Sequence, residues 1–157
     1  MKKTVTIIAA IAITAALAGP AEALRRIGTS ASETIHGSDY EDYLAGGGGN
    51  DTIYGYSARD GIDGDPGNDT LYGHGGNDIL NGETGSDAVY GGAGGDFITA
   101  SAFDRVISGG VGDDTFYFYR STTYTGTIGC GDGYDTVNVY NAGNKPVLQN
   151  CEVVKYL

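Results

Sequence analysis

Apolar residues recur along this chain at intervals of nine, from residue 28 to residue 117. Ten consecutive units of nine residues share an eighth position that is apolar in every unit. These ten residues are Ile35, Leu44, Ile53, Ile62, Leu71, Leu80, Val89, Ile98, Ile107 and Phe116. Since 40% of the chain is hydrophobic, ten matches in ten have chance odds on the order of one in ten thousand. The pattern therefore indicates a structural repeat and not low-complexity glycine sequence.

Each unit divides into a turn and a very short strand. The first half is rich in Gly, Asn and Asp, and the last three residues favour β-branched or aromatic types, as in GGGGNDTIY from Gly46 and GGVGDDTFY from Gly109. A three-residue strand is not stable alone, so the units must coil and stack. With two units per coil, each strand pairs in parallel with its equivalent 18 residues later, about 4.8 Å away. The sequence thus predicts an all-β parallel β-roll of about five two-strand coils over residues 24–117.

The sixth position of the unit is acidic in nine of the ten units. These residues are Glu33, Asp42, Asp51, Asp60, Asp69, Asp78, Asp87, Asp96 and Asp114, with Arg105 in the ninth unit. Because successive units alternate between two edges of the roll, the acids form two ladders, whereas Asp65 and Asp104 fall outside them. Neighbouring carboxylates about 5 Å apart repel by roughly 0.9 kcal/mol even at the dielectric constant of water. The ladders therefore call for bound cations.

Calcium suits such a site, because it takes six to eight hard oxygen ligands, and a tight glycine turn offers several carbonyls beside a carboxylate. The unit, G-G-x-G-x-D-x-U-x with U a large apolar residue, resembles the repeats-in-toxin (RTX), or haemolysin-type, calcium-binding nonapeptide repeat, in its small secreted bacterial form. The resemblance covers residues 28–117. It implies a right-handed β-roll with several Ca²⁺ ions between successive turns, and we expect a chain that is largely disordered until Ca²⁺ binds. The expected metal ligands are Asp42, Asp51, Asp60, Asp69, Asp78, Asp87, Asp96, Asp114 and Asp135.

Two units depart from the pattern in ways that affect the ladders. Asp60 follows Ala58 and Arg59 where six of the ten turns have glycine at the fourth position, so we expect a weaker site there. In the ninth unit, Arg105 is either a solvated surface residue or, as we favour, a built-in cation that pairs with carboxylates and ends its ladder below Asp87.

The period breaks after Tyr117, and residues 118–157 are expected to cap the roll. A repeat-like turn returns from Cys130, 21 residues after Gly109, which would place Asp135 beneath Asp114. In an exported chain, Cys130 and Cys151 are expected to form a disulfide that pins this cap.

Residues 1–23 read as a secretory signal peptide, with two lysines, an apolar run and a small-residue end at Ala23. The apolar run is shorter than a membrane span needs. Without this segment the chain has seven basic and nineteen acidic side chains, a net charge of −12. Such a surface repels nucleic acid and anionic membranes, so we expect a secreted protein with no nucleic-acid partner and no membrane insertion.

No catalytic pattern stands out, since neither an H-E-x-x-H nor a G-x-S-x-G sequence occurs, and His36 and His74 read as solvent-facing residues. We therefore expect a protein that is not an enzyme. Tyr54, Tyr72 and Tyr90 recur every 18 residues and should stack on one sheet. Two interpretations stay open: the tyrosines stabilise the sheet, or they form an adhesion or interaction surface for a glycan, a cell surface or another copy of the protein.

Overall fold

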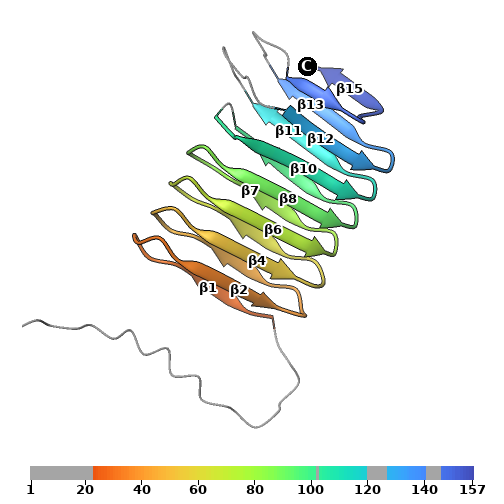
Figure 1. Cartoon of the computed structure of the whole chain (residues 1–157). Coiled ribbons are helices and arrows are strands. Elements are labelled where there is room, and N and C mark those ends of the chain that lie inside the picture. Colours follow the sequence, from red (N-terminus) through yellow and green to blue (C-terminus); the bar gives the residue numbers. More distant parts are fainter. Residues whose placement is uncertain (1–22, 102, 120–126, 141–145) are drawn as a thin grey trace, which may run out of the picture.

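The computed structural model describes residues 23–101, 103–119, 127–140 and 146–157. Described residues form strands and turns that coil into an elongated rod, with the described N-terminal and C-terminal segments at opposite ends (Figure 1). No helix among them is long and apolar enough to cross a membrane. The predicted signal peptide, residues 1–23, lies outside the described residues apart from Ala23.

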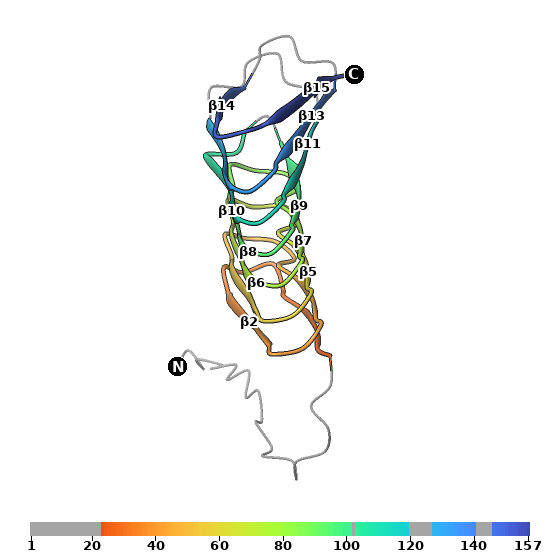
Figure 2. The ribbon, with the colours of Figure 1, turned by 90° about the vertical axis from the view of Figure 1, so that its right-hand side faces the viewer.

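Two parallel sheets face each other across the rod, as the view along their edges in Figure 2 shows. The eight-stranded sheet contains, in spatial order, β1 (Arg25–Ile27), β3 (Tyr43–Ala45), β5 (Gly61–Asp63), β7 (Ile79–Asn81), β9 (Phe97–Ala100), β11 (Thr115–Tyr119), β13 (Thr136–Tyr140) and β15 (Val153–Tyr156). The seven-stranded sheet contains β2 (Thr34–Ser38), β4 (Thr52–Tyr56), β6 (Thr70–Gly75), β8 (Ala88–Ala93), β10 (Val106–Val111), β12 (Thr127–Asp132) and β14 (Val147–Gln149). The chain thus alternates between sheets at every strand, which confirms the predicted parallel β-roll.

The predicted 18-residue register holds through the repeats. Leu71 pairs with Ile53 in the preceding coil and with Val89 in the next. All ten eighth-position residues are buried, and they form one continuous core cluster. The other inward position of each strand is the first residue of the following unit, which is glycine in most coils. One large side chain per strand therefore makes a thin core.

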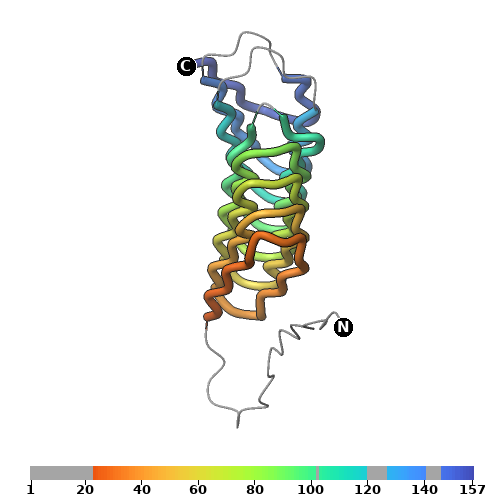
Figure 3. The backbone as a smooth tube through the Cα atoms, turned by 90° about the vertical axis from the view of Figure 1, so that its left-hand side faces the viewer, coloured from red at the N-terminus to blue at the C-terminus, as the bar shows by residue number. Residues whose placement is uncertain are grey.

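The coil continues beyond the repeats, so the roll has about seven coils where the sequence predicted about five. Strands β12 to β15 extend both sheets, and the tube in Figure 3 runs on without a change of architecture. The nonapeptide period misses these coils because their length changes: β10 and β12 pair 21 residues apart, and β12 and β14 pair 20 residues apart. Larger side chains also take over the glycine position there. Phe118, Cys130 and Val139 fill that inward position and are each at most 1% exposed, which thickens the core.

Candidate metal-binding ladders

The acidic residues form two ladders. Each ladder lies in the turns that lead into the strands of one sheet. In each ladder the carboxylate Oδ1 accepts a hydrogen bond from the backbone N–H of the ladder residue one coil earlier. Asp78 Oδ1 accepts from Asp60 N at 2.8 Å, and Asp96 Oδ1 accepts from Asp78 N at 2.8 Å. In the other ladder, Asp87 Oδ1 accepts from Asp69 N at 2.8 Å. Nearly all of these side chains are buried, because each turn is covered by its neighbours along the rod.

The first ladder precedes the seven-stranded sheet and consists of Glu33, Asp51, Asp69, Asp87 and Asp104. The second ladder precedes the eight-stranded sheet and consists of Asp42, Asp60, Asp78, Asp96, Asp114, Asp135 and Glu152. The predicted alternation of units between two edges is therefore confirmed. Whether each carboxylate binds a metal stays a prediction.

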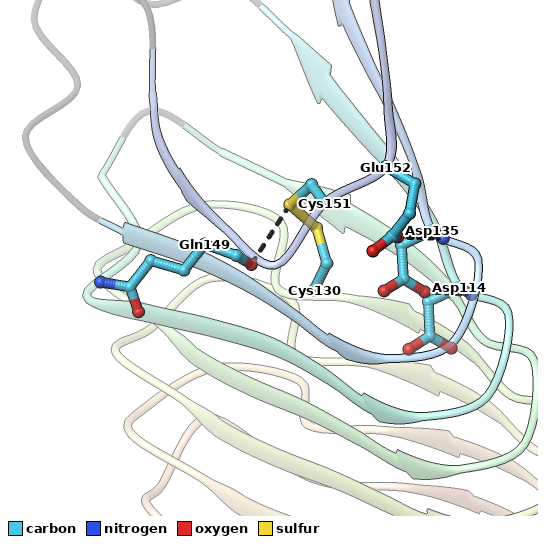
Figure 4. The surroundings of a disulfide bond; sticks show 6 residues. All are labelled: Asp114, Cys130, Asp135, Gln149, Cys151 and Glu152. Atoms are coloured by element: carbon cyan, nitrogen blue, oxygen red, sulfur yellow. Dashed lines mark hydrogen bonds between the residues drawn. A yellow bond between two sulfur atoms is a disulfide. The ribbon is translucent and has the colours of Figure 1, made fainter.

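At the C-terminal end, the expected position of Asp135 is also confirmed. Asp135 Oδ1 accepts from Asp114 N at 2.8 Å, across a spacing of 21 residues. Glu152 Oε2 in turn accepts from Asp135 N at 2.8 Å, so Glu152 is a further ladder residue that the sequence reasoning missed (Figure 4). Its signal was the order Asn150, one residue, Glu152 and then two valines, which matches the fourth to eighth positions of a repeat.

The prediction for the ninth unit was wrong on two residues. Arg105 is exposed and does not stand in the first ladder. Its place is taken by Asp104, which is 3% exposed and whose Oδ1 accepts from Asp87 N at 3.4 Å. The strand keeps its 18-residue register, since Val106 pairs with Ala88. The ladder residue comes one position earlier, 17 residues after Asp87, and Arg105 is an extra residue between it and the strand. A backbone that closes this turn early brings Asp104 inward and turns Arg105 out to solvent.

Eight ladder aspartates carry a buried Oδ2 atom with no hydrogen-bond partner. They are Asp51, Asp60, Asp69, Asp78, Asp87, Asp96, Asp114 and Asp135. Burying an ionised oxygen without a donor is unfavourable, so a buried carboxylate normally binds a cation or takes up a proton. These eight atoms mark positions where the polypeptide alone leaves a negative charge uncompensated.

Glycine at the first position of the unit makes room for this oxygen. A Cβ on Gly46 would lie 2.6 Å from Asp51 Oδ2 and 2.5 Å from the carbonyl oxygen of Gly64 in the next coil. The same holds at Gly73, where a Cβ would lie 2.4 Å from Asp78 Oδ2 and 2.5 Å from the carbonyl oxygen of Gly91. Two acceptor oxygens thus face the same space between coils. Repeated along the rod, this arrangement suits a cation that binds carboxylate and carbonyl oxygens together.

The ladders differ from a metal centre built of several side chains. Within the described residues, no three His, Cys, Asp or Glu side chains gather around one point. Successive carboxylates lie one coil apart, so an ion between coils would take most of its ligands from backbone carbonyls. That ligand set consists of hard oxygen donors, which favours Ca²⁺ over metals that prefer nitrogen or sulfur.

Burial also changes the acidity of the ladder carboxyls in the metal-free roll. Desolvation raises the pKa of Asp60 to about 7, and it raises the pKa of Asp96 to about 7 as well. The pKa of Asp69 and the pKa of Asp114 rise to about 6 for the same reason. Hydrogen bonds from the backbone oppose the rise, and neighbouring carboxylates add to it. The charge of these carboxylates can therefore be neutralised either by a proton or by a bound metal ion.

An aromatic stack covers the outer face of the seven-stranded sheet. Tyr54 stacks on Tyr72 with ring centroids 5.1 Å apart, and Tyr72 stacks on Tyr90 at 5.0 Å. His36 extends this column beside Tyr54 at 5.2 Å. Tyr56 and His74 form a second column next to it, 5.7 Å apart. The stacking of the three tyrosines is confirmed, and both histidines, expected only to face solvent, belong to the same stack.

The predicted disulfide between Cys130 and Cys151 is present, with a Cα–Cα distance of 5.3 Å. It joins β12 to the turn that carries Glu152, so the bond lies next to the end of the second ladder (Figure 4). A disulfide of this kind fits an oxidising compartment.

Stacked turns, two parallel sheets and two carboxylate ladders define a β-solenoid of the calcium-binding β-roll class. Comparison with protein families agrees: the model of the RTX calcium-binding nonapeptide repeat matches four times, at residues 27–62, 56–89, 63–98 and 90–119. The chain belongs to this family. A comparison with curated proteins gives no match.

Proposed function

We propose that this protein is a secreted calcium-binding protein in which Ca²⁺ ions between stacked turns drive folding of the β-roll. The observation that carries the proposal is the set of eight buried Oδ2 atoms without a hydrogen-bond partner. Ca²⁺ beside each of them would supply the missing positive charge and would draw on carbonyl oxygens of the adjacent coil. No catalytic role is proposed, because the family match concerns the calcium-binding repeat alone.

Two features of the chain support secretion. Residues 1–23 have the features of a secretory signal peptide, and the disulfide fits an oxidising compartment. Extracellular calcium modules commonly have dissociation constants around 10⁻⁴ to 10⁻³ M. A roll with that affinity would remain unfolded in the calcium-poor cytoplasm and fold after export.

The central test is a titration of residues 24–157 with Ca²⁺ by calorimetry, with folding followed by far-UV circular dichroism. We expect binding and the gain of β-structure to coincide at millimolar Ca²⁺. Mg²⁺ should largely fail, since it demands a smaller, octahedral shell. A chain that binds no Ca²⁺, or that folds equally well in EDTA, would contradict the proposal.

Single substitutions test whether the ladder residues are the ligands. Asp69→Asn and Asp78→Asn keep the side-chain shape but remove charge from the middle of each ladder. Each should lower the number of bound ions or raise the Ca²⁺ midpoint about tenfold, equivalent to 1.4 kcal/mol. Asp65→Asn is the matched control, because Asp65 accepts a bond from Gly47 N but lies outside the ladders. Equal effects of Asp65→Asn and Asp69→Asn would refute the ligand assignment.

The alternative function is an interaction module that uses Tyr54, Tyr72 and Tyr90. The rings lie within 5° to 8° of parallel, so their faces cover one another and mainly their edges remain for a partner. This geometry favours the stabilising role over a platform for sugar stacking. Alanine at all three positions separates the two roles: lost adhesion or self-association with intact Ca²⁺-dependent folding would favour the interaction module.

A further inference from the structure

Three turns at the ends of the ladders are closed by a hydroxyl group, and they share one hydrogen-bond pattern. In the turn of Asp42, the backbone N–H of Ser38 donates to Asp42 Oδ2 at 2.6 Å. The Ser38 hydroxyl contacts the same Oδ2 at 3.0 Å, and it accepts from Tyr40 N at 3.2 Å. The Oδ2 atom has no hydrogen-bond donor elsewhere in the ladder, but here it accepts hydrogen bonds from within its own turn.

The same pattern recurs in the turn of Asp104. Ser101 N donates to Asp104 Oδ2 at 2.6 Å, the Ser101 hydroxyl donates to Asp104 Oδ1 at 2.8 Å, and Phe103 N donates to Ser101 Oγ at 3.2 Å. We call these two turns, together with the turn of Glu33, the hydroxyl-closed turns.

The turn of Glu33 is the third. Thr29 N donates to Glu33 Oε2 at 2.6 Å, and Ala31 N donates to Thr29 Oγ1 at 3.2 Å. All three hydroxyl-closed turns thus carry Ser or Thr at the second position and a residue other than glycine two positions later.

The remaining turns, which we call the open turns, have a different backbone conformation. Their second residue adopts positive φ in every case: Gly47, Tyr56, Asp65, His74, Glu83, Gly92, Gly110 and Gly131. Positive φ recurs two residues later at Gly49, Ala58, Gly76, Gly85, Gly94, Gly112 and Gly133. The eight open turns are the same eight whose aspartate has an unpartnered Oδ2. Tyr56, His74 and Ala58 show that this backbone is imposed at a cost in strain even where the residue is not glycine.

We infer that the hydroxyl-closed turns bind no calcium and end the rows of ions, whereas each open turn holds one. This inference rests on the proposed calcium-binding function. In an open turn, the carboxylate Oδ2 lacks a donor and needs a cation. In the turns of Asp42 and Asp104, backbone N–H and hydroxyl groups already donate to both carboxylate oxygens, and in the turn of Glu33 a backbone N–H donates to Oε2. An ion would have to break those bonds. Asp42, a predicted ligand, and Asp104 are then structural residues that close the ladders.

A first experiment counts Ca²⁺ ions bound by residues 24–157 with paired substitutions. Asp42→Asn is compared with Asp60→Asn on the second ladder, and Asp104→Asn with Asp87→Asn on the first. We expect the ion count to fall by at least one for Asp60→Asn and Asp87→Asn and to stay unchanged for the other two. If Asp42→Asn or Asp104→Asn loses as many ions as its partner variant, the inference is overturned. A wild-type chain that binds no Ca²⁺ would instead refute the proposed function.

A second experiment converts a closed turn into an open one. Ser38→Gly with Tyr40→Gly removes the closing hydroxyl and supplies glycine at the second and fourth positions of the unit. The double variant should bind one more Ca²⁺ than the wild type, with the Ca²⁺-saturated circular dichroism spectrum retained. Ser86→Gly is the control, since Ser86 lies in an open turn and contacts Asn68 only through its backbone N–H. An unchanged ion count in the double variant, with the roll intact, overturns the inference.

Discussion

The middle coils of the roll repeat one another closely, whereas the coils at both ends depart from the nonapeptide. In the middle, each strand contributes one large core side chain, and each turn leaves a buried carboxylate oxygen without a donor. At the N-terminal end, the turns of Glu33 and Asp42 are closed by hydrogen bonds from within the turn. At the C-terminal end, Phe118 and Val139 thicken the core beside the disulfide. If the proposed function holds, the middle depends on bound ions, while the ends rely on bonds within the chain.

Removal of calcium should show the difference between the middle coils and the C-terminal end most clearly. In EDTA, residues 24–157 should lose most of their β-structure, because the thin core does not offset repulsion along the ladders. Residual protection should persist around Cys130 and Phe118, where the core is thickest. Hydrogen exchange read by mass spectrometry, with and without Ca²⁺, measures this directly. Protection lost uniformly along the chain would remove the distinction between the middle and the C-terminal end.

Acid should partly replace calcium in the middle coils. Burial raises the pKa of Asp60 and the pKa of Asp96 to about 7 in the folded roll, above the value of about 4 for an unfolded Asp. The protonated form therefore stabilises the metal-free roll, fully below about pH 4, and this contribution is lost as the pH rises through 7. In EDTA, β-structure measured by circular dichroism should increase from pH 8 to pH 5.

The calcium-bound roll should show the opposite dependence on pH. Ca²⁺ binds the ionised carboxylates, so the Ca²⁺ midpoint for folding should rise about tenfold or more from pH 8 to pH 5. Titrations monitored by circular dichroism at each pH give that midpoint. A midpoint independent of pH would show that the buried carboxyls do not exchange protons for calcium.

Loss of the disulfide should weaken the C-terminal end in particular. The bond spans 21 residues, and in the loop-entropy model such a closure contributes roughly 3 kcal/mol. Cys130→Ser with Cys151→Ser should lower the free energy of unfolding in Ca²⁺ by about that amount, measured by urea denaturation. In EDTA, this variant should also lose the residual protection near Phe118. Retention of that protection would assign it to the thicker core alone.

At the N-terminal end, a charged side chain occupies a position that core residues occupy in the other strands. Arg26 pairs in register with Leu44, so it occupies the position of a core residue in the edge strand β1. All strands are parallel, and a second copy stacked head to tail would extend both sheets. Arg26→Leu should therefore produce assembly that grows with protein concentration, seen by sedimentation. Arg25→Leu makes the same charge change at an outward position over the Tyr43 ring, and it should stay monomeric. Equal assembly by both variants would implicate net charge.

The sequence predicts the middle of the molecule well and the ends less well, for a physical reason. The 18-residue register, the core column and the two ladders all follow from a period that repeats without insertion. Asp135 was also located, because its turn retains the glycine pattern after a three-residue insertion. Asp104 and Glu152 were missed because both lie 17 residues after their ladder neighbour. The Glu152 coil is 17 residues long, whereas the Asp104 coil keeps its 18-residue register and places one extra residue between the acid and the strand. Both arrangements preserve the hydrogen bond to the preceding coil but not the count along the chain, which only the backbone path reveals.

The smallest expected effect concerns Ala58, the one described fourth-position residue of an open turn that is not glycine. Its φ is +73°, a left-handed conformation that costs a residue with a Cβ about 1 kcal/mol relative to glycine. Asp60 nevertheless keeps its ladder bonds, to Asp42 N at 2.8 Å and from its own N–H to Asp78 at 2.8 Å. The expected weakness of this site therefore reflects strain and not a missing ligand.

Ala58→Gly should raise the stability of the Ca²⁺-bound roll by about 0.5 to 1 kcal/mol and lower the Ca²⁺ midpoint. Gly112→Ala puts Cβ into an equivalent turn with φ of +128° and against the backbone carbonyl of Gly94, so it should destabilise the roll by more than Ala58→Gly stabilises it. Urea denaturation at fixed Ca²⁺ measures both, and a destabilised Ala58→Gly variant would show that the left-handed backbone at this position is not under strain.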